Sequence, residues 1–513
     1  MQATVMVLRP GSAKSLTPAD CGLPTSCQSP KVVEATRGGN SAGAGQVQLP
    51  PKSAFLAAML FYTVMKPLVQ VALRVFFRKL ELRHPERLQL PGPLLVCSNH
   101  PNTLMDPLVA AVSRRQPIAF LAKSTFFKNP VLRAIMESGN SIPIYRRQDV
   151  DSGAEVLTPA QLEAQNEKAF GRCYDYFDRG GTIMIFPEGT SVQERRLRPL
   201  KTGAARIALG AEARHDFRLG LRILPMGINY FDPRRFRSDV FVNLAEPITV
   251  AEYAEQYRQS PEAAADALTE EIRRRMEQRL VITRTDEEDE LVTQVERTFG
   301  QHLIQDDEET LYDNFQLSRT LLKAVRYFEQ HNAGDLGEVR EQLHAYHQEL
   351  HRLRLTDDAL ESRSRTGSRL SRALAAGVRL VLGAPLYLYG LINSYLPYKI
   401  PSLVAGRATK DVEFVAPILL VVGMITFTLF YLIQTALVHH FTDSWLWTIL
   451  YFISLPLTGF YALSYAGNLR GRLRRLRVLR LFRQQRPRME ALLRQRTELI
   501  RRLREARTAY LAR

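Results

Sequence analysis

The chain has 513 residues, more than one ordinary domain needs, and carries a formal net charge of +17. Such a charge indicates an anionic partner, which is nucleic acid, anionic lipid or a phosphorylated substrate. The four cysteines show neither a metal-type pairing nor a disulfide framework, so we expect a reducing compartment and no metal site.

The N-terminal segment is rich in Gly, Ser, Ala, Pro and Thr and lacks hydrophobic periodicity, so we expect residues 1–50 to be disordered. It also lacks a long apolar run behind a basic start, which argues against a cleaved signal peptide. We assign no function to this segment.

Residues 54–77 are strongly apolar, but Lys66, Pro67 and Arg74 interrupt the run. A helix that crossed a membrane here would place Lys66 near the bilayer centre, where a charge is costly. We therefore expect residues 51–80 to form a helix that lies on the membrane surface, and a simple transmembrane helix is the less favoured alternative.

Residues 81–250 alternate between short apolar runs and helix-compatible stretches, among them 161–177 and 202–213. Pro, Gly and Asn bound the apolar runs, as is usual for buried strands. This alternation predicts an α/β domain in which a mixed sheet is covered by helices. The predicted strands are 94–98, 118–122, 141–145, 182–186, 222–228 and 240–244.

Residues 251–370 are highly charged, contain few Gly or Pro and have a helical period, as in EEIRRRMEQRL and VREQLHAYHQELHRL. We interpret them as a helical extension. Their charges then belong to solvated helix faces and not to a site.

Two uncharged segments follow, 414–438 and 445–466, and each is long enough to cross a membrane. Only HHFTDS separates them, and Trp445 and Trp447 lie beside this turn, where aromatic residues anchor a helix at the interface. We expect a membrane hairpin within the region 371–468.

A further apolar segment, 373–395, contains Arg379 and Pro385 and has basic residues on both sides. Short positive loops stay on the cytoplasmic side, so we expect this segment to be interfacial or re-entrant and not to cross. The protein is then a multi-pass membrane protein, with the α/β domain and the C-terminus on the cytoplasmic side.

In residues 469–513, leucines at helical spacing alternate with arginines, which predicts a basic amphipathic tail helix. Such a tail directly after a membrane helix suits anionic lipid headgroups. Nucleic-acid binding is the alternative, but no zinc, RNP-like or helix-turn-helix pattern accompanies the charge, so we expect no nucleic-acid partner.

The stretch VCSNHPNTLMDP ends a predicted strand in Asn99 and His100 and reaches Asp106 six positions after the histidine. Histidine is the usual proton acceptor near neutral pH, and a carboxylate on its second ring nitrogen fixes the tautomer. Residues six apart on a helix point about 120° apart, so the two side chains meet only if His100 lies in a loop and Asp106 in the next first turn. Alternatively, Asp106 caps a helix and His100 is a polar strand end, and this stretch alone leaves both interpretations open.

A second strand ends in FPEGTS, which places Glu188 where open α/β sheets often carry functional side chains. Gly189 permits a close backbone approach or a positive φ, Thr190 follows it, and Lys201 precedes a predicted helix. Taken alone, a strand and turn with a helix cap explains this stretch better than a site does.

A third strand ends in Arg146 and Arg147, and arginine is the residue best suited to hold a phosphate by two hydrogen bonds. The fourth stretch, ILPMGINY, ends a strand that contains Pro225 and Gly227.

Together, the four stretches resemble the glycerolipid acyltransferase family, which includes glycerol-3-phosphate and lysophosphatidate acyltransferases. The resemblance covers residues 85–250, about a third of the chain, and its specificity lies in the combination and order of the stretches. Five residues separate His100 from Asp106 where most members have four. Fungal-type glycerol-3-phosphate acyltransferases share the longer spacing and also have membrane segments after the catalytic domain.

The resemblance implies direct acyl transfer from acyl-CoA or acyl-ACP to a hydroxyl of glycerol 3-phosphate or 1-acylglycerol 3-phosphate, as in phosphatidic acid synthesis. No bound cofactor and no metal are then required. His100 is the implied general base and Asp106 its partner. The implied substrate-binding residues are Asn99, Arg146, Arg147, Glu188, Gly189, Thr190 and Lys201.

Two other functions stay open at this point. One is a lysophospholipid transacylase or remodelling acyltransferase with the same motifs, and the other is a non-catalytic membrane scaffold. The intact motif residues argue against the scaffold, and the absence of a Gly-x-Ser-x-Gly elbow argues against a serine hydrolase.

Overall fold

The structure is a computed structural model, and the expected disordered segment 1–50 lies outside the residues that it describes. Part of the predicted helical extension, 361–369, lies outside them as well. The described residues are 52–151, 153, 157–233, 235–303, 310–357, 360 and 370–511.

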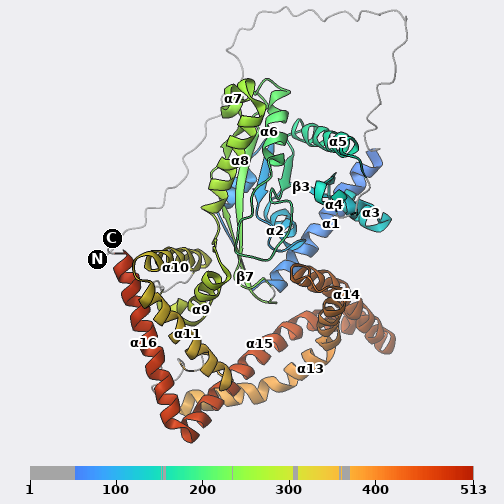
Figure 1. Ribbon diagram of the computed structural model, residues 1–513. Coiled ribbons are helices and arrows are strands. Elements are labelled where there is room, and N and C mark those ends of the chain that lie inside the picture. The colour runs from blue at the N-terminus through green and yellow to red at the C-terminus, as the bar shows by residue number, and fades with distance from the viewer. Residues whose placement is uncertain are drawn as a thin grey trace, which may run out of the picture. The chain divides into compact units, whose positions relative to one another are not determined.

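An eight-stranded mixed sheet forms the centre of the α/β domain (Figure 1). Its strands are β1 Lys79–Arg83, β2 Leu94–Ser98, β3 Ile118–Lys123, β4 Ser141–Ile144, β5 Thr182–Ile185, β6 Arg222–Tyr230, β7 Asp239–Leu244 and β8 Ile248–Thr249. They lie in the order β1-β7-β6-β2-β5-β3-β4, with β8 beside β6. The neighbours from β6 to β4 are mutually parallel, whereas β7 is antiparallel to β6. Their carboxyl ends therefore share one edge, where open α/β sheets bind ligands.

Helices cover both faces of this sheet. They are α1 Lys52–Phe76, α2 Met105–Ser113, α3 Pro130–Ser138, α4 Arg147–Asp151, α5 Pro159–Phe177, α6 Gly203–Ala213, α7 Ala254–Gln259 and α8 Pro261–Glu277. Side chains alternate along a strand, so Leu95 and Cys97 of β2 face the core under α5, α6 and α8. Leu94 and Val96 face the opposite core, under α1 and α2.

The predicted mixed sheet covered by helices is confirmed, and the six predicted strands are present with ends shifted by at most two residues. The sequence analysis missed β1 and the two-residue β8. β1 has the sequence KLELR at the edge of the sheet. Its alternating charges hide it from a search for continuous apolar runs, which mark strands buried on both faces.

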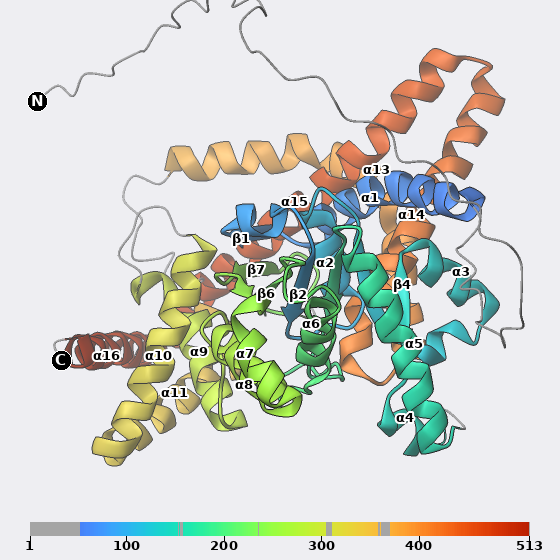
Figure 2. The same ribbon diagram turned by 90° about the horizontal axis from the view of Figure 1, so that it is seen from above.

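Helix α1 is continuous, although Pro67 lies inside it. Its last turn enters the core through Leu73 and Phe76. Lys66, whose charge argued against a transmembrane helix, donates from Nζ to two carbonyl oxygens at the end of α2, where a cation is favoured. α1 also lies beside α14 (Val415–Thr442) in both views (Figures 1 and 2). Its position on a membrane surface stays a prediction.

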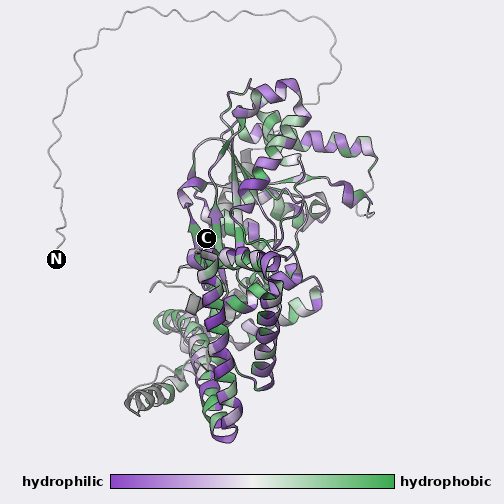
Figure 3. Ribbon diagram, turned by 60° about the vertical axis from the view of Figure 1, so that its left-hand side comes forward, coloured by the Kyte–Doolittle hydropathy of each residue, from purple (hydrophilic) through white to green (hydrophobic). Residues whose placement is uncertain are grey.

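The helical extension packs against the C-terminal helix around a shared apolar core. These helices are α9 Asp286–Leu303, α10 Leu311–His331, α11 Ala333–Arg352 and α16 Arg486–Leu511. Hydrophilic and hydrophobic residues alternate along the long helices in Figure 3. Met489, Leu492 and Leu499 of α16 are buried in this core. The apolar face of α16 is therefore covered by protein.

Three long helices form the apolar part of the chain: α13 Leu370–Ala408, α14 and α15 Trp445–Gln484. Among the described residues, two segments are long and apolar enough to cross a membrane, Val412–Thr442 and Trp445–Gln484. They contain the two segments that the sequence analysis paired as a hairpin.

The segment 373–395 differs from its prediction in one respect. It belongs to the continuous helix α13, so the re-entrant form is wrong, and an interfacial position stays a prediction. Hydrogen bonds join α13 to both neighbours. Asn393 Oδ1 accepts from the Tyr451 hydroxyl of α15 at 2.7 Å, and the Asn393 carbonyl oxygen accepts from Gln434 Nε2 of α14 at 3.0 Å.

The buried ion pair between the tail helix and the extension predicts a stability effect. Arg496 donates to both carboxylate oxygens of Asp357 at 2.7 and 2.6 Å, and their side chains are only 11% and 6% exposed. Arg496→Leu leaves Asp357 buried without this partner and should destabilise the helical region by about 3 kcal/mol. Thermal unfolding in detergent measures this, with Arg501→Leu, which breaks exposed pairs on the same helix, as the control. Equal melting temperatures for the two variants would contradict the prediction.

Candidate active site

His100 lies in the loop between β2 and α2, and Asp106 lies in the first turn of α2. This is the arrangement that the six-residue spacing requires. The Nδ1 atom of His100 is 2.8 Å from Asp106 Oδ2. A carboxylate oxygen only accepts, so Nδ1 is the donor and Nε2 of the neutral ring is left as the acceptor. The ring also stacks on Phe186 at 3.8 Å between centroids and 12° between planes, and the side chain is 20% exposed.

Asp106 is fully buried and accepts hydrogen bonds from three groups. Besides His100, the backbone N–H of Asn102 donates to Oδ2 at 2.8 Å, and the Tyr230 hydroxyl donates to Oδ1 at 2.7 Å. Burial and the charge of Asp106 raise the pKa of Tyr230 well above its usual range, so this hydroxyl stays a donor. The sequence analysis missed Tyr230, because it is 124 positions from Asp106 and ends an apolar strand.

Glu188 ties the FPEGTS turn to the histidine loop. Its Oε1 accepts from the backbone N–H of His100 at 3.2 Å, and its Oε2 accepts from the backbone N–H of Arg198 at 3.1 Å. Burial raises the pKa of Glu188, and the two backbone hydrogen bonds oppose this shift. Both oxygens are thus directed at protein backbone, which makes Glu188 a residue that shapes the site.

Gly189 adopts a φ of +71°, which favours glycine over residues with a side chain. A Cβ atom here would lie 2.6 Å from the Nζ atom of Lys201. The glycine therefore lets Lys201 approach the turn. Burial and the nearby charge of Arg146 lower the pKa of Lys201. Thr190 follows in the turn and is partly exposed.

The guanidinium group of Arg146 is bonded to acceptors of the protein itself. It donates two hydrogen bonds of 2.8 Å to Asp149 and one of 2.6 Å to the Gly189 carbonyl oxygen. It thereby braces the FPEGTS turn, and the sequence analysis did not identify Asp149 as its partner. Arg147 begins α4 and is exposed, and Lys201 Nζ is 3.3 Å from Gln148 Oε1.

Asn99 is close to His100, but its amide is used by the backbone of β6. Its Nδ2 donates to the Ile228 carbonyl oxygen at 3.0 Å, and its Oδ1 accepts from the Ile228 N–H at 2.8 Å. The side chain joins the ends of β2 and β6. Asn99 therefore positions the histidine loop. The resemblance implied that Asn99 binds the substrate, and that role stays a prediction.

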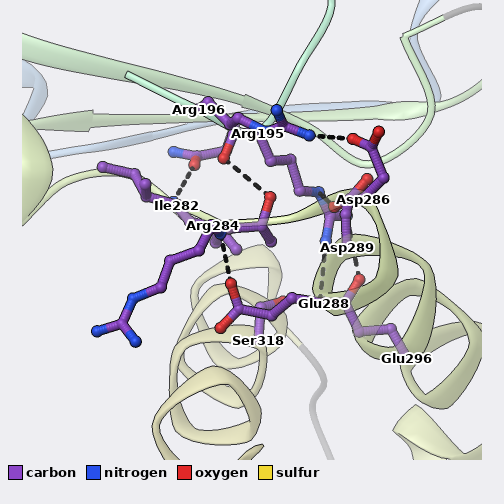
Figure 4. Close-up of polar contacts among 12 residues, drawn as sticks. Arg195, Arg196, Ile282, Arg284, Asp286, Glu288, Asp289, Glu296 and Ser318 are labelled. Carbon is purple, nitrogen blue, oxygen red and sulfur yellow. Dashed lines mark hydrogen bonds and ion pairs between the residues drawn. The ribbon is translucent and has the colours of Figure 1, made fainter. Parts of the chain in front are cut away.

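The loop after FPEGTS is clamped to the helical extension (Figure 4). Arg195 donates to Glu296 at 3.1 Å, and Arg196 forms an ion pair with Asp286. Burial lowers the pKa of Arg195, but the charges of Glu296 and Asp289 outweigh burial and raise it. The extension therefore fixes the loop that follows FPEGTS, which the charge pattern alone did not indicate.

Among the residues that the structure describes, no three His, Cys, Asp or Glu side chains gather as metal ligands. The polar groups at this edge of the sheet combine a histidine–aspartate pair after β2 with three cations, Arg146 and Arg147 after β4 and Lys201 before α6. This arrangement suits proton transfer next to an anionic substrate.

Known proteins share this region. The family model described as Acyltransferase matches residues 79–229. Over 108 residues, 21% of this chain, the sequence is 36% identical to Glycerol-3-phosphate O-acyltransferase 2 of Saccharomyces cerevisiae, and the match covers 14% of that protein. Over 116 residues, 23% of this chain, it is 29% identical to the chloroplastic 1-acyl-sn-glycerol-3-phosphate acyltransferase BAT2 of Brassica napus, of which it covers 29%.

Among solved structures, the 1-acyl-sn-glycerophosphate acyltransferase PlsC from Thermotoga maritima aligns with 44% of this chain and 84% of its own. The TM-score is 0.29 and the identity 19%. Of the two curated relatives named above, the chain covers only 14% and 29% of the length. Residues 79–229 therefore carry an acyltransferase domain, and the relatives named above that resemble part of this chain are glycerolipid acyltransferases.

Proposed function

We propose that this protein transfers a fatty acyl group from an acyl thioester to a hydroxyl of glycerol 3-phosphate or 1-acylglycerol 3-phosphate. The observation that carries the proposal is the His100–Asp106 pair at the carboxyl edge of the sheet, with one imidazole nitrogen left as an acceptor. The acyltransferase domain itself supplies the reaction class. The donor is the thioester of coenzyme A or acyl carrier protein, so no bound cofactor is needed.

In this reaction, His100 Nε2 takes the proton from the acceptor hydroxyl as its oxygen attacks the thioester carbon. An oxygen–carbon bond forms and the carbon–sulfur bond breaks. The thiolate leaves and takes the proton back from the imidazolium. Asp106 holds the ring in the productive tautomer and stabilises the imidazolium. The stack on Phe186 keeps the ring from rotating.

For the acceptor phosphate, we propose Lys201 and Arg147 as direct partners and Arg146 as their support. Arg146 has three of its donors on protein groups, whereas Arg147 is exposed at the start of α4. Glu188, Gly189 and Thr190 shape the turn between these cations and His100. Asn99 acts through the strand that it joins to the histidine loop.

Two features favour glycerol 3-phosphate as the acceptor. Five residues lie between His100 and Asp106, the spacing that the resemblance connects with fungal-type enzymes. In addition, 108 residues, 21% of this chain, are 36% identical to a yeast glycerol-3-phosphate acyltransferase.

We also propose that the enzyme is a multi-pass membrane protein. The two apolar helices supply a hairpin, and α1 and the arginines of the tail add contacts with the surface and with anionic headgroups. A hairpin returns the chain to the side from which it entered, so the catalytic domain and the tail share the cytoplasmic side. The regions are a membrane-surface helix at 51–80, the acyltransferase domain at 81–250, the extension at 251–370, the membrane region at 371–468 and the tail at 469–513.

The first prediction concerns the general base. His100→Ala should lower acyl transfer by at least about 100-fold, the usual contribution of general-base catalysis. Purified full-length protein is given a labelled acyl thioester with glycerol 3-phosphate, dihydroxyacetone phosphate or lysophosphatidate. His215→Ala is the matched control, because His215 forms a surface pair with Asp178 at 2.8 Å. If His100→Ala keeps more than about a tenth of the activity, His100 is not the base. If the wild type uses none of these acceptors, lysophospholipid acceptors test the transacylase alternative.

A second prediction concerns the partner of Asp106. Tyr230→Phe removes the hydroxyl that donates to Asp106 Oδ1 and leaves the packing nearly unchanged. We expect kcat to fall about tenfold with little change in KM, because a hydrogen bond to a charged group is lost next to the base. Steady-state kinetics measure this, with Tyr253→Phe, which lies in the turn before α7, as the control. An unchanged kcat would show that Tyr230 does not support the pair.

The third prediction separates the cations. Lys201→Met should raise KM for glycerol 3-phosphate about tenfold, because a charge-assisted contact with the phosphate is lost. KM for the acyl thioester should stay within about twofold of the wild type. The control is Lys168→Met, an exposed lysine on α5. Equal changes for both substrates would contradict a role in binding the acceptor phosphate.

A further inference from the structure

Thr103, in the loop between β2 and α2, joins three parts of the chain. Its backbone N–H donates to Ser191 Oγ at 3.0 Å, in the FPEGTS turn. Its hydroxyl donates at 2.9 Å to the carbonyl oxygen of Glu413, which lies directly before α14 and 310 positions away. The φ of Thr103 is 28°, a left-handed conformation that β-branched residues rarely adopt. Such a conformation persists where the surroundings impose it.

The start of α14 also shares a hydrophobic core with the helix that carries Asp106. Ala416 is 1% exposed and Leu420 is 4% exposed, and both lie in one core with Met105 and Val109 of α2. Further along the same helix, Leu429 is 52% exposed. The first turns of α14 therefore belong to the core of the α/β domain, and the later turns to the apolar bundle.

We infer that the start of α14 is part of the scaffold of the active site, and that Thr103 is the positioning residue that connects it to His100 and Asp106. The inference rests on the proposed function, because it takes His100 as the base. The hydroxyl bond to Glu413 fixes the middle of the loop whose two ends carry the pair. The rate of acyl transfer then depends on how α14 packs against the α/β domain.

A purely local role for Thr103 does not need its hydroxyl. The backbone bond to Ser191 and the hydrogen bonds of Asp106 already hold the loop within the α/β domain. The hydroxyl adds a link to the segment that enters the membrane. The scaffold role therefore predicts that removing the hydroxyl alone changes catalysis.

The first test removes only that hydroxyl, in full-length protein in lipid nanodiscs. Thr103→Val keeps the shape and the β-branch, so the backbone strain is unchanged, but the donor is lost. We expect kcat to fall about five- to tenfold with KM for both substrates within about twofold. Thr103→Ser keeps the donor and should retain at least about half of the wild-type kcat. The matched control is Thr269→Val in α8, which removes a similar bond to the Ala265 carbonyl oxygen of 2.7 Å.

A second pair of variants tests the membrane helix from its own side. Leu420→Ala loosens the packing of α14 in the core that it shares with α2, whereas Leu429→Ala shortens a side chain of the same helix at an exposed position. We expect Leu420→Ala to lower kcat at least about fivefold and Leu429→Ala to stay near the wild type. Equal activities for the two variants, or a Thr103→Val enzyme with wild-type kcat, would overturn the inference.

Hydrogen exchange gives a measure that does not depend on activity. Amides of residues 99–106 should exchange about five- to tenfold faster in Thr103→Val and Leu420→Ala than in the wild type, and at the wild-type rate in the two controls. If the wild type transfers no acyl group but exchange responds as expected, the proposed function fails and the structural link stands. If exchange is the same in all variants, the inference fails whatever the activity.

Discussion

A buried carboxylate has to be met by hydrogen-bond donors, and the arrangement of this active site depends on how Asp106 meets that requirement. Two of its donors, His100 Nδ1 and the Asn102 N–H, lie in the histidine loop, and the third, the Tyr230 hydroxyl, lies at the end of β6. The loop, α2 and β6 are therefore fixed together at one point. Asn99 also links β2 to β6, through its side-chain amide. Two sets of hydrogen bonds therefore fix the position of His100.

The second constraint is the turn that follows β5. Glu188 directs both carboxylate oxygens at backbone N–H groups, one of them that of His100, and Gly189 leaves room for Lys201. Arg146 braces the same turn through the Gly189 carbonyl oxygen. Several polar residues of this site therefore hold backbone in place, and fewer are left to meet a substrate. His100, Lys201 and Arg147 therefore remain as the groups that can act on a substrate.

Segments outside the acyltransferase domain complete this frame. The extension holds the loop after the turn through Arg195 and Glu296 (Figure 4), and the start of α14 holds the histidine loop through Thr103. An enzyme that joins a soluble thioester to an acceptor whose product enters lipid gains from such an attachment. Under the proposed function, the histidine loop lies next to a helix that we propose enters the bilayer, and the product is released close to that surface.

The sequence by itself determined the strand–helix alternation, the position of the site at the strand ends and the two apolar helices. These features follow from local periodicity and from the residue types at strand ends. Both can be identified from residues that are close together in the sequence. The sequence also set the condition under which His100 and Asp106 can meet, but not whether they do. Tyr230 and Glu413 became partners of the site only through the tertiary structure, because no local pattern relates positions 124 and 310 residues apart. Asp149 lies only three positions after Arg146, a spacing at which helix side chains can meet, so this ion pair could have been predicted from the sequence.

The tertiary structure also decided between roles that the residue type leaves open. Arginine suits phosphate binding, yet Arg146 is held by Asp149 and Gly189. The tail is amphipathic, yet Met489, Leu492 and Leu499 of α16 pack on the extension, whereas Leu473, Leu476 and Leu479 before this helix are more than half exposed. In both cases the residue type fixes which interactions are available, and the neighbours that the fold supplies determine which of them form.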